Sequence, residues 1–441
     1  MNPRSRSLFP ILTLLALTLA APVSAQDSQA TATATAKKTQ DTKTTRVLTT
    51  PALVVKTIDN EVAMAMLSNF GSPDLLPDLE KGKHYVLKLF GPHRLKVSTG
   101  DGDVGFLEVM VTPGLLVKVF EEDLSEQLSA VEANIIFTLG QFGVPTKEIA
   151  KMTRAVASFP HQIAQLDLRV EGNPMKGPKG VKIDLRLTPA ANTWFSKIVD
   201  GLEPNDQGAP LLDVTGAPMS LSVAVKPGGL VALLEPMLGL MACLGTRNKD
   251  ERQTSRGMLL KILNGYDGSM AVAGDPFAGN VKAITGLRNA AGVKEVMASE
   301  PFGKLTENQA SIVPTVDAEF EQRAFTHRDV AVSRLTMDMS ASGLNQVTTQ
   351  YTAVAGSYLL TYSGENEGPA KAMIDAVLDQ KVKRAPLAKS ALLTLTLDLE
   401  KMFDRLAGLG IPAPMEEDGP RLAEIRLFRG ENSLQLKVSI E

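Results

Sequence analysis

The chain has 441 residues, of which 44% are hydrophobic and 22% are charged, so it can bury a large core in two domains or in one duplicated domain. Its formal net charge of −3 argues against a nucleic-acid-binding protein, because phosphate recognition needs a basic surface. The single cysteine, Cys243, cannot form an intramolecular disulfide. It lies in apolar sequence, where a thiol usually behaves as a small buried hydrophobic group with a raised pKa.

The first 25 residues are typical of a cleavable secretory signal. Arg4 and Arg6 precede an apolar run over 8–20, and Val23-Ser24-Ala25 supplies the small residues that signal peptidase cuts after. The apolar run is shorter than the roughly 20 residues of a membrane-spanning helix, which makes an uncleaved anchor the less favoured alternative. We expect cleavage near Ala25 and a periplasmic or secreted mature protein without a transmembrane segment.

The mature chain divides into a spacer and three folded regions. Residues 26–46 contain no large apolar side chain, so they cannot bury enough surface to fold, and we predict a disordered Ala/Thr-rich spacer. An N-terminal α+β region then covers 47–159, a first α+β half covers 160–310, and a second α+β half covers 311–441.

The N-terminal region combines helices and strands. Asp59 is placed to cap a helix whose apolar residues between 62 and 70 have helical spacing. Strands follow at 84–90, 94–98 and 106–111, and two further helices begin at Asp123 and near Thr146, the second ending near Phe159.

The first half alternates strictly between apolar and polar residues in 166–170 and 181–187, which predicts a β-hairpin. A helix with Trp194 on its apolar face follows, and then a strand around Leu221 that leads into an apolar helix from Gly228. Weaker strand patterns at 270–273 and 281–284 close this half.

The second half shows the same order of elements. The residues at 335–339 alternate, strands are predicted at 347–354 and 358–362, and Pro369 opens a helix. A strand at 393–397, a helix with Met402, Phe403 and Leu406, and a hairpin of 423–427 with 434–440 complete the chain. Matching Leu166 to Leu335, Trp194 to Met373 and Leu221 to Leu393 indicates a duplicated hairpin-helix-strand-helix-hairpin unit, although alternating strands also align by chance.

Alternating strands belong to sheets that have one wet face, whereas buried parallel strands form continuous apolar runs. The sequence therefore predicts an α+β fold, in which helices pack on one face of large antiparallel or mixed sheets.

No local motif predicts catalysis. Gly100 to Gly105 has the G-x-G-x-x-G spacing of a dinucleotide loop, but a strand pattern follows where that loop requires a helix, which favours a hairpin turn. The four histidines, His84, His93, His161 and His327, are scattered without zinc-binding spacing. Acidic runs at 121–123 and 416–418 are interpreted as a helix start and a solvated loop. We predict no catalytic residue, no metal ligand and no cofactor.

One segment is unusual. Residues 227–244 are apolar on every side of a helix, with Glu235 as the only charge, so this helix must be buried or must meet an apolar ligand or a membrane. A central core helix is the simpler interpretation. The alternative is the wall of an apolar cavity, formed by Leu230, Leu233, Leu234, Met237, Leu238 and Met241.

These patterns favour an exported, non-catalytic binding or carrier protein for an apolar or lipid-like ligand. A structural or protein-interaction component of the cell envelope and a hydrolase with a dispersed site remain the alternatives. The expected partners are an apolar small molecule or an envelope protein, and not nucleic acid.

Overall fold

A computed structural model describes most of the chain after residue 49. The described residues are 50–64, 76–90, 94–102, 104–119, 133, 136, 137, 140, 144–173, 179–213, 216–244, 246, 248–276, 278–311, 316–338, 347–408 and 421–441. The signal, the spacer, both acidic runs, His93 and most of the helix predicted after Asp123 lie outside these residues.

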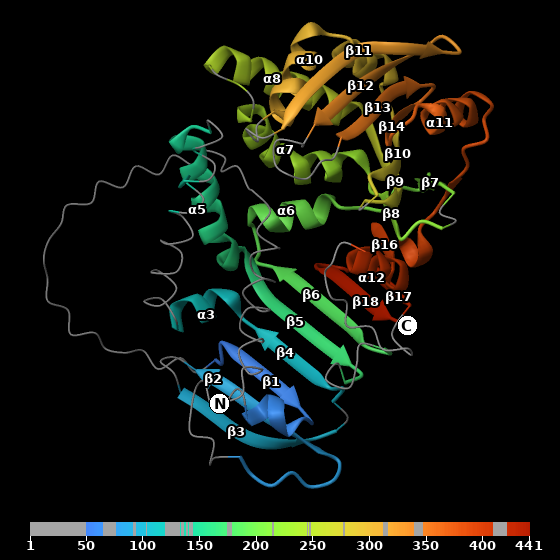
Figure 1. Ribbon diagram of the computed structural model, residues 1–441. Helices are drawn as coiled ribbons and strands as arrows, with labels where there is room; N and C mark the ends of the chain where they lie inside the picture. The colour runs from blue at the N-terminus through green and yellow to red at the C-terminus, as the bar shows by residue number, and fades with distance from the viewer. Residues whose placement is uncertain are drawn as a thin grey trace, which may run out of the picture.

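One antiparallel sheet of 16 strands runs through the molecule, and strands of all three predicted regions belong to it (Figure 1). Its order is β11-β12-β13-β14-β10-β9-β8-β16-β17-β18-β6-β5-β4-β1-β2-β3. The strands are β1 Leu53–Thr57, β2 Lys83–Phe90, β3 Arg94–Asp101, β4 Leu107–Val111, β5 Ile163–Glu171, β6 Lys182–Pro189, β8 Met219–Ala224, β9 Tyr266–Asp275, β10 Asn280–Leu287, β11 Asp317–His327, β12 Val330–Asp338, β13 Val347–Ala355, β14 Tyr358–Ser363, β16 Leu393–Asp398, β17 Leu422–Arg429 and β18 Leu434–Ile440.

A small second sheet and the helices complete the described elements. The two-residue strands β7, Ala209–Pro210, and β15, Arg384–Ala385, pair with each other. The helices are α3 Pro113–Val119, α5 Thr146–Gln162, α6 Trp194–Gly201, α7 Pro227–Cys243, α8 Lys249–Gly265, α9 Ala290–Met297, α10 Glu300–Ala310, α11 Gly368–Leu378 and α12 Leu399–Gly408, with a short 3₁₀ helix at Ala388–Ser390.

Strand register sorts the side chains into two faces, because residues directly opposite each other point to the same side. Leu221 lies opposite Val272 and Leu395, and Leu395 lies opposite Ile425, which defines an apolar inner face over the middle of the sheet. The outer face is the opposite side. On β17, β18, β6, β5, β4 and β1 it carries ion pairs, among them Arg426–Glu424 and Lys56–Glu108.

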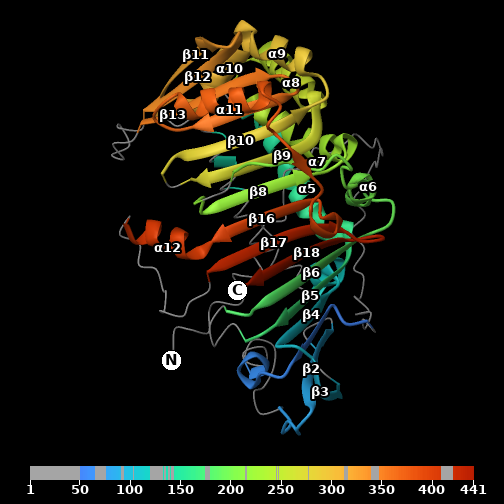
Figure 2. The ribbon, with the colours of Figure 1, turned by 90° about the vertical axis from the view of Figure 1, so that its right-hand side faces the viewer.

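Helices cover both faces, so the prediction that they pack on one face is wrong at one end of the sheet. Helices α6, α8, α9 and α10 lie against the inner face, whereas α11 packs on the outer face of β12, β13 and β14 (Figure 2). The physical reason is that the outer side of these strands carries large apolar side chains. Tyr351, Ala353 and Leu360 point outward and need the cover that α11 provides.

Several local predictions are confirmed with shifted boundaries. Asp59 caps its helix, since its Oδ1 accepts hydrogen bonds from the backbone N–H of Glu61 and Val62. The helix predicted from Thr146 is α5, which has Pro145 as its N-cap and continues to Gln162. The segment after Gly105 is strand β4, so the helix that a dinucleotide loop requires does not follow. The predicted hairpin turn is wrong, because β4 pairs with β1 and β5 and not with β3, which pairs with β2.

Candidate functional site

A cavity lies between the inner face of the sheet and helices α8, α9 and α10. Its volume is about 290 Å³, close to the roughly 300 Å³ at which small-molecule pockets in proteins begin. The strands β12, β13 and β14 form its floor, and the helices form its roof.

The roof is built by helical spacing. Phe302, Leu305, Thr306 and Gln309 occupy positions i, i+3, i+4 and i+7 of α10, so one face of this helix points into the cavity. Leu259 and Ile262 of α8 join them. Phe320 of β11 closes one side, and its ring meets that of Phe302 edge to face with centroids 6.4 Å apart.

The floor mixes apolar and polar side chains. Ser333 lies opposite Thr352, and Thr352 lies opposite Thr361, so three hydroxyls stand in a row across β12, β13 and β14. Gln350, Leu335 and Leu359 flank this row and also line the cavity. Strand alternation places all six on the inner face, because their neighbours in sequence point to α11.

The lining is uncharged. Among the described residues that line the cavity there is no aspartate, glutamate, lysine, arginine or histidine. Tyr266 contributes a phenol, and burial raises its pKa, so this group stays protonated at neutral pH.

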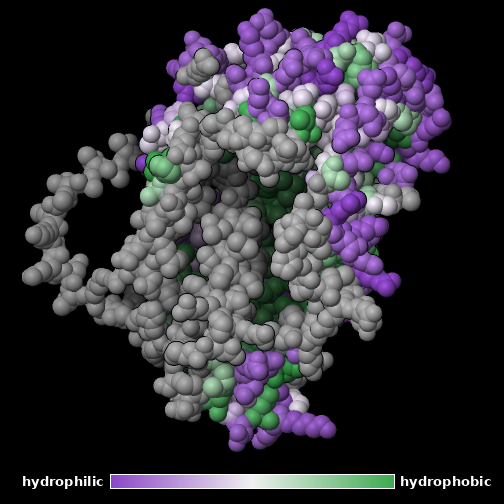
Figure 3. All heavy atoms as spheres, viewed as in Figure 1, coloured by the Kyte–Doolittle hydropathy of each residue, from purple (hydrophilic) through white to green (hydrophobic). Residues whose placement is uncertain are grey.

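The inner face continues from this floor as an apolar strip over the middle of the sheet. Thr361 lies opposite Ala283 and Ala283 lies opposite Val272, from which the register leads across β8 and β16 to β6. Large aliphatic side chains on this inner strip are only half-buried: Val272, Leu221, Leu395, Ile425, Val438 and Ile183. Figure 3 shows hydrophobic atoms over the middle of the molecule.

Helix α7 spans Pro227–Cys243 and packs against α6, α8 and β9. None of its six predicted ligand-binding residues lines the cavity. Leu238 is buried, Leu230, Leu234 and Met237 are half-buried, and Leu233 and Met241 are exposed. The helix nevertheless touches the roof, because the side-chain amide of Gln309 donates a hydrogen bond of 2.8 Å to the carbonyl oxygen of Met241. A ligand role for these six residues stays a prediction.

Cys243 ends α7 inside a small apolar cluster with Val144 and Ile149. Its side chain is buried, and this burial raises the pKa of the thiol. Both observations agree with the structural role expected from the sequence.

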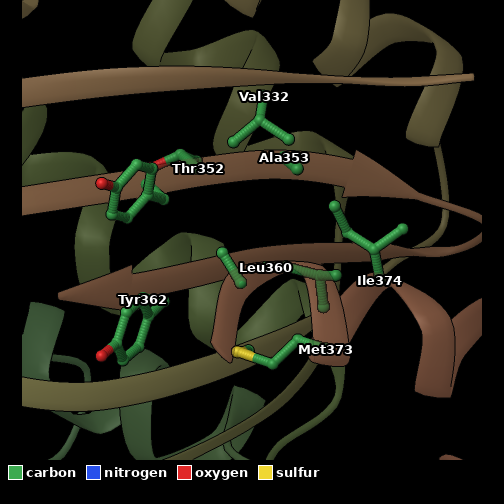
Figure 4. Close-up of a pocket in the computed structure, with 9 residues that line it drawn as sticks. Val332, Thr352, Ala353, Leu360, Tyr362, Met373 and Ile374 are labelled. Carbon is green, nitrogen blue, oxygen red and sulfur yellow. The ribbon is translucent and has the colours of Figure 1, made fainter. Parts of the chain in front are cut away.

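A second, much smaller space lies on the outer face of the same strands. Val332, Leu360 and Tyr362 meet Met373 and Ile374 of α11 there, and they leave only about 10 Å³ (Figure 4). This volume is about that of one water probe, so the site is a packed core and not a ligand pocket.

The described histidines do not converge. His84 is buried with its Nδ1 3.3 Å from the carbonyl oxygen of Gly102, and His161 is exposed in the last turn of α5. His327 ends β11 before a tight turn at Arg328 and Asp329, and its Nε2 lies 2.8 Å from Asp375 Oδ1 on α11. No serine, threonine or cysteine hydroxyl or thiol of the described chain bonds to His327.

Within the described part of the chain, no group of three or more His, Cys, Asp or Glu side chains is arranged to hold a metal ion. None of the described helices is both long and apolar enough to cross a membrane. Comparison of the chain with models of protein families, with curated proteins and with solved structures gives no match.

The sequence contains local signals for the helices of the cavity roof. Asn248 caps α8 by accepting from the backbone N–H of Glu251, the spacing of a capping motif, and Leu259 and Ile262 lie on one face of that helix. Pro301 lies in the first turn of α10, where proline is favoured, and so indicates where that helix begins. The floor carried no such signal, because its hydroxyl row spans three strands.

Proposed function

We propose that this chain is an exported, non-catalytic binding or carrier protein for an apolar or lipid-like ligand. The observation that carries the proposal is the 290 Å³ cavity, whose aliphatic and aromatic roof leads onto an inner apolar strip of half-buried aliphatic side chains. A row of aliphatic side chains that is only partly buried and adjoins a cavity is suited to receive an apolar ligand.

The inner strip is long enough to match a long acyl chain. From β14 to β6 the sheet makes seven steps between neighbouring strands. At about 4.8 Å a step, the strip extends roughly 34 Å along the sheet. This is comparable to the hydrocarbon core of a bilayer, about 30 Å, so the strip is at least as long as an extended acyl chain.

Export is part of this proposal, and its support is the signal pattern of residues 1–25 in the sequence. A carrier of apolar molecules is needed where such molecules must cross water, and a periplasmic or secreted location would place the protein in that setting.

Binding is tested with the purified chain that begins after Ala25. Titration with N-phenyl-1-naphthylamine, a neutral probe that fluoresces in apolar surroundings, should give a saturable increase. Linear, non-saturable uptake would overturn the proposal. Native mass spectrometry of protein from its own host should also find a small molecule bound to the chain.

A matched pair of variants locates the probe. Thr352→Phe projects a ring into the cavity, whereas Thr349→Phe places the same ring on the opposite face of β13, and both threonines are half-buried. We expect Thr352→Phe to weaken probe binding about tenfold, a loss of about 1.4 kcal/mol, while Thr349→Phe binds like the parent. Equal effects of the two changes would place the binding site elsewhere.

We also infer that the sheet contains two copies of a hairpin-helix-strand-helix-hairpin unit. The two units meet where β8 pairs with β16, and each is followed from there toward its own end of the sheet. One unit has the order β8-β9-β10-β14-β13, and the other has the corresponding order β16-β17-β18-β6-β5. The small β7–β15 pair joins the matching segments of both units. Strand β5 holds Leu166, which the sequence comparison matched to Leu335 of β12. In the order of the sheet, β5 corresponds to β13 and not to β12. Helices α6 and α11 pack on opposite faces, so the likeness lies in the strands.

An experimental structure tests this inference. If 163–287 and 347–440 superpose strand for strand, the duplication stands, and a different strand order in either half would contradict it.

A further inference from the structure

Three polar side chains on the cavity floor have hydrogen-bonding capacity that the described chain does not use. The amide of Gln350 and the hydroxyls of Thr352 and Thr361 line the cavity, and none of them bonds to another described residue. Ser333 is different, because its hydroxyl donates to the carbonyl oxygen of Thr352 over 3.3 Å. Half-buried polar groups of this kind take their partners from water or from a ligand.

The unused groups are neutral and can both donate and accept. A threonine hydroxyl offers one donor and two acceptor sites, and a glutamine amide offers two donors and an acceptor oxygen. They suit a hydroxyl, which also donates and accepts, and their donors suit an ester carbonyl.

A charged head group finds no counter-ion here. No described charged side chain lines the cavity, and the protonated phenol of Tyr266 adds another neutral donor. Moving an ionised carboxylate or ammonium out of water without an opposite charge is strongly unfavourable.

Polar and apolar surfaces are also separated in space. The unused groups lie on β13 and β14, whereas the inner strip from β9 to β6 presents aliphatic side chains. A ligand that satisfies both surfaces has a polar head at β13 and β14 and an apolar tail that extends toward β8 and β16.

We propose that the ligand of this site is an uncharged amphiphile, a long-chain alcohol or acylglycerol, with its hydroxyl or ester head at Gln350, Thr352 and Thr361. This inference rests on the proposed binding function, since it names the chemical class of the molecule that the same cavity receives.

The test is a competition among three molecules that share one alkyl chain. Stearyl alcohol, stearate and stearylamine are added, each below its aggregation concentration, to the mature protein loaded with N-phenyl-1-naphthylamine. We expect stearyl alcohol to displace the probe at about a tenth of the concentration that either ion needs. Equal or stronger displacement by stearate or stearylamine overturns the head-group assignment while leaving the binding function intact. Absence of saturable probe uptake overturns both.

A conservative variant separates head recognition from packing. Thr361→Val removes only the hydroxyl from the floor, and Thr396→Val makes the same change on the outer face of β16. We expect Thr361→Val to lose most of the preference for stearyl alcohol over its ions while binding the apolar probe normally. The Thr396→Val protein should keep the preference. An unchanged preference in Thr361→Val would overturn the role given to this hydroxyl.

Discussion

The two faces of strands β12, β13 and β14 differ sharply although they share one backbone. On the outer face, the stacked rings of Tyr351 and Tyr362, with centroids 6.2 Å apart, pack with α11 and leave about 10 Å³. On the inner face, the same strands and helices α8 and α10 leave about 290 Å³. The space is therefore not a sign of loose packing at this end of the molecule. It arises because short hydroxyl side chains occupy the inner positions where aromatic rings occupy the outer ones.

The largest expected effect tests the outer face. Ile374 of α11 is 1% exposed, and Ile374→Ala should lower the free energy of unfolding by about 4 kcal/mol. Leu359→Ala on the cavity side should cost about 2 kcal/mol, because that side chain already lacks neighbours on one side. Urea denaturation of both variants measures the difference. Equal losses would mean that the two faces are packed alike.

Arg384, which follows α11, should come next. Its guanidinium bonds to Asp267 Oδ2 at 2.6 Å, Tyr358 Oη at 3.1 Å and Gln207 Oε1 at 3.0 Å, and the side chains of Arg384 and Asp267 are 18% and 13% exposed. Arg384→Met leaves the Asp267 carboxylate with no counter-ion and should cost about 3 kcal/mol.

The double variant Asp267→Asn with Arg384→Met controls for this charge. It should recover part of the stability lost in Arg384→Met, measured by urea denaturation. No recovery would show that the arginine acts through packing and not through charge.

Neighbouring residues of β13 give the sharpest comparison of the faces. Ala353 points outward and is 4% exposed, so Ala353→Leu should overpack the outer core and cost about 2 kcal/mol. Thr352→Leu places the same side chain in the cavity and should leave stability within about 0.5 kcal/mol. Thermal unfolding of the unliganded proteins compares them, and a larger loss in Thr352→Leu would contradict the difference between the faces.

The smallest effect concerns pH. A hydrogen bond from His327, joined by one from Arg328, lowers the pKa of Asp375 below its ordinary value of 3.8. A lowered folded-state pKa stabilises the fold above the ordinary value, and this contribution is lost as the pH falls through the lowered one. Asp375→Asn should therefore flatten the acid side of the stability profile, measured by urea midpoints below pH 5.

Probe binding to the uncharged cavity should not share this pH dependence. Because none of the described residues that line it titrates near this range, the affinity for N-phenyl-1-naphthylamine should not change while the protein remains folded. An affinity that follows the titration of Asp375 would connect the two faces.

Sequence patterns predicted most strands of the large sheet, but they predicted neither β1 nor β11 and did not predict the cavity. The alternation at 166–170 and 181–187 predicted a hairpin that the structure confirms as β5 and β6. The α+β class followed from such strands. The second face of β13 was not anticipated, because an apolar tyrosine and alanine among polar residues resemble ordinary alternation until a helix is seen to cover them.

The candidate site depends on pairings that no local pattern encodes. Thr361 and Ala283 lie opposite each other although 78 positions separate them in sequence. The volume of the cavity depends on how far α8 and α10 stand from the sheet, and this distance results from packing in three dimensions. The apolar composition of α7 drew attention to that helix, yet the roof is made by α8 and α10, which are more ordinary amphipathic helices.

The position of β18 has a consequence for how the chain acquires its structure. This strand is Leu434–Ile440, near the last residue in sequence, yet it lies inside the sheet between β17 and β6. Until it has been translated, β6 has no partner on that side and presents an open edge. Pairing across such sequence separations is slow. The central sheet therefore cannot close before residues 434–440 have been synthesised, and removal of residues 434–441 should divide it into two sheets with unpaired edges.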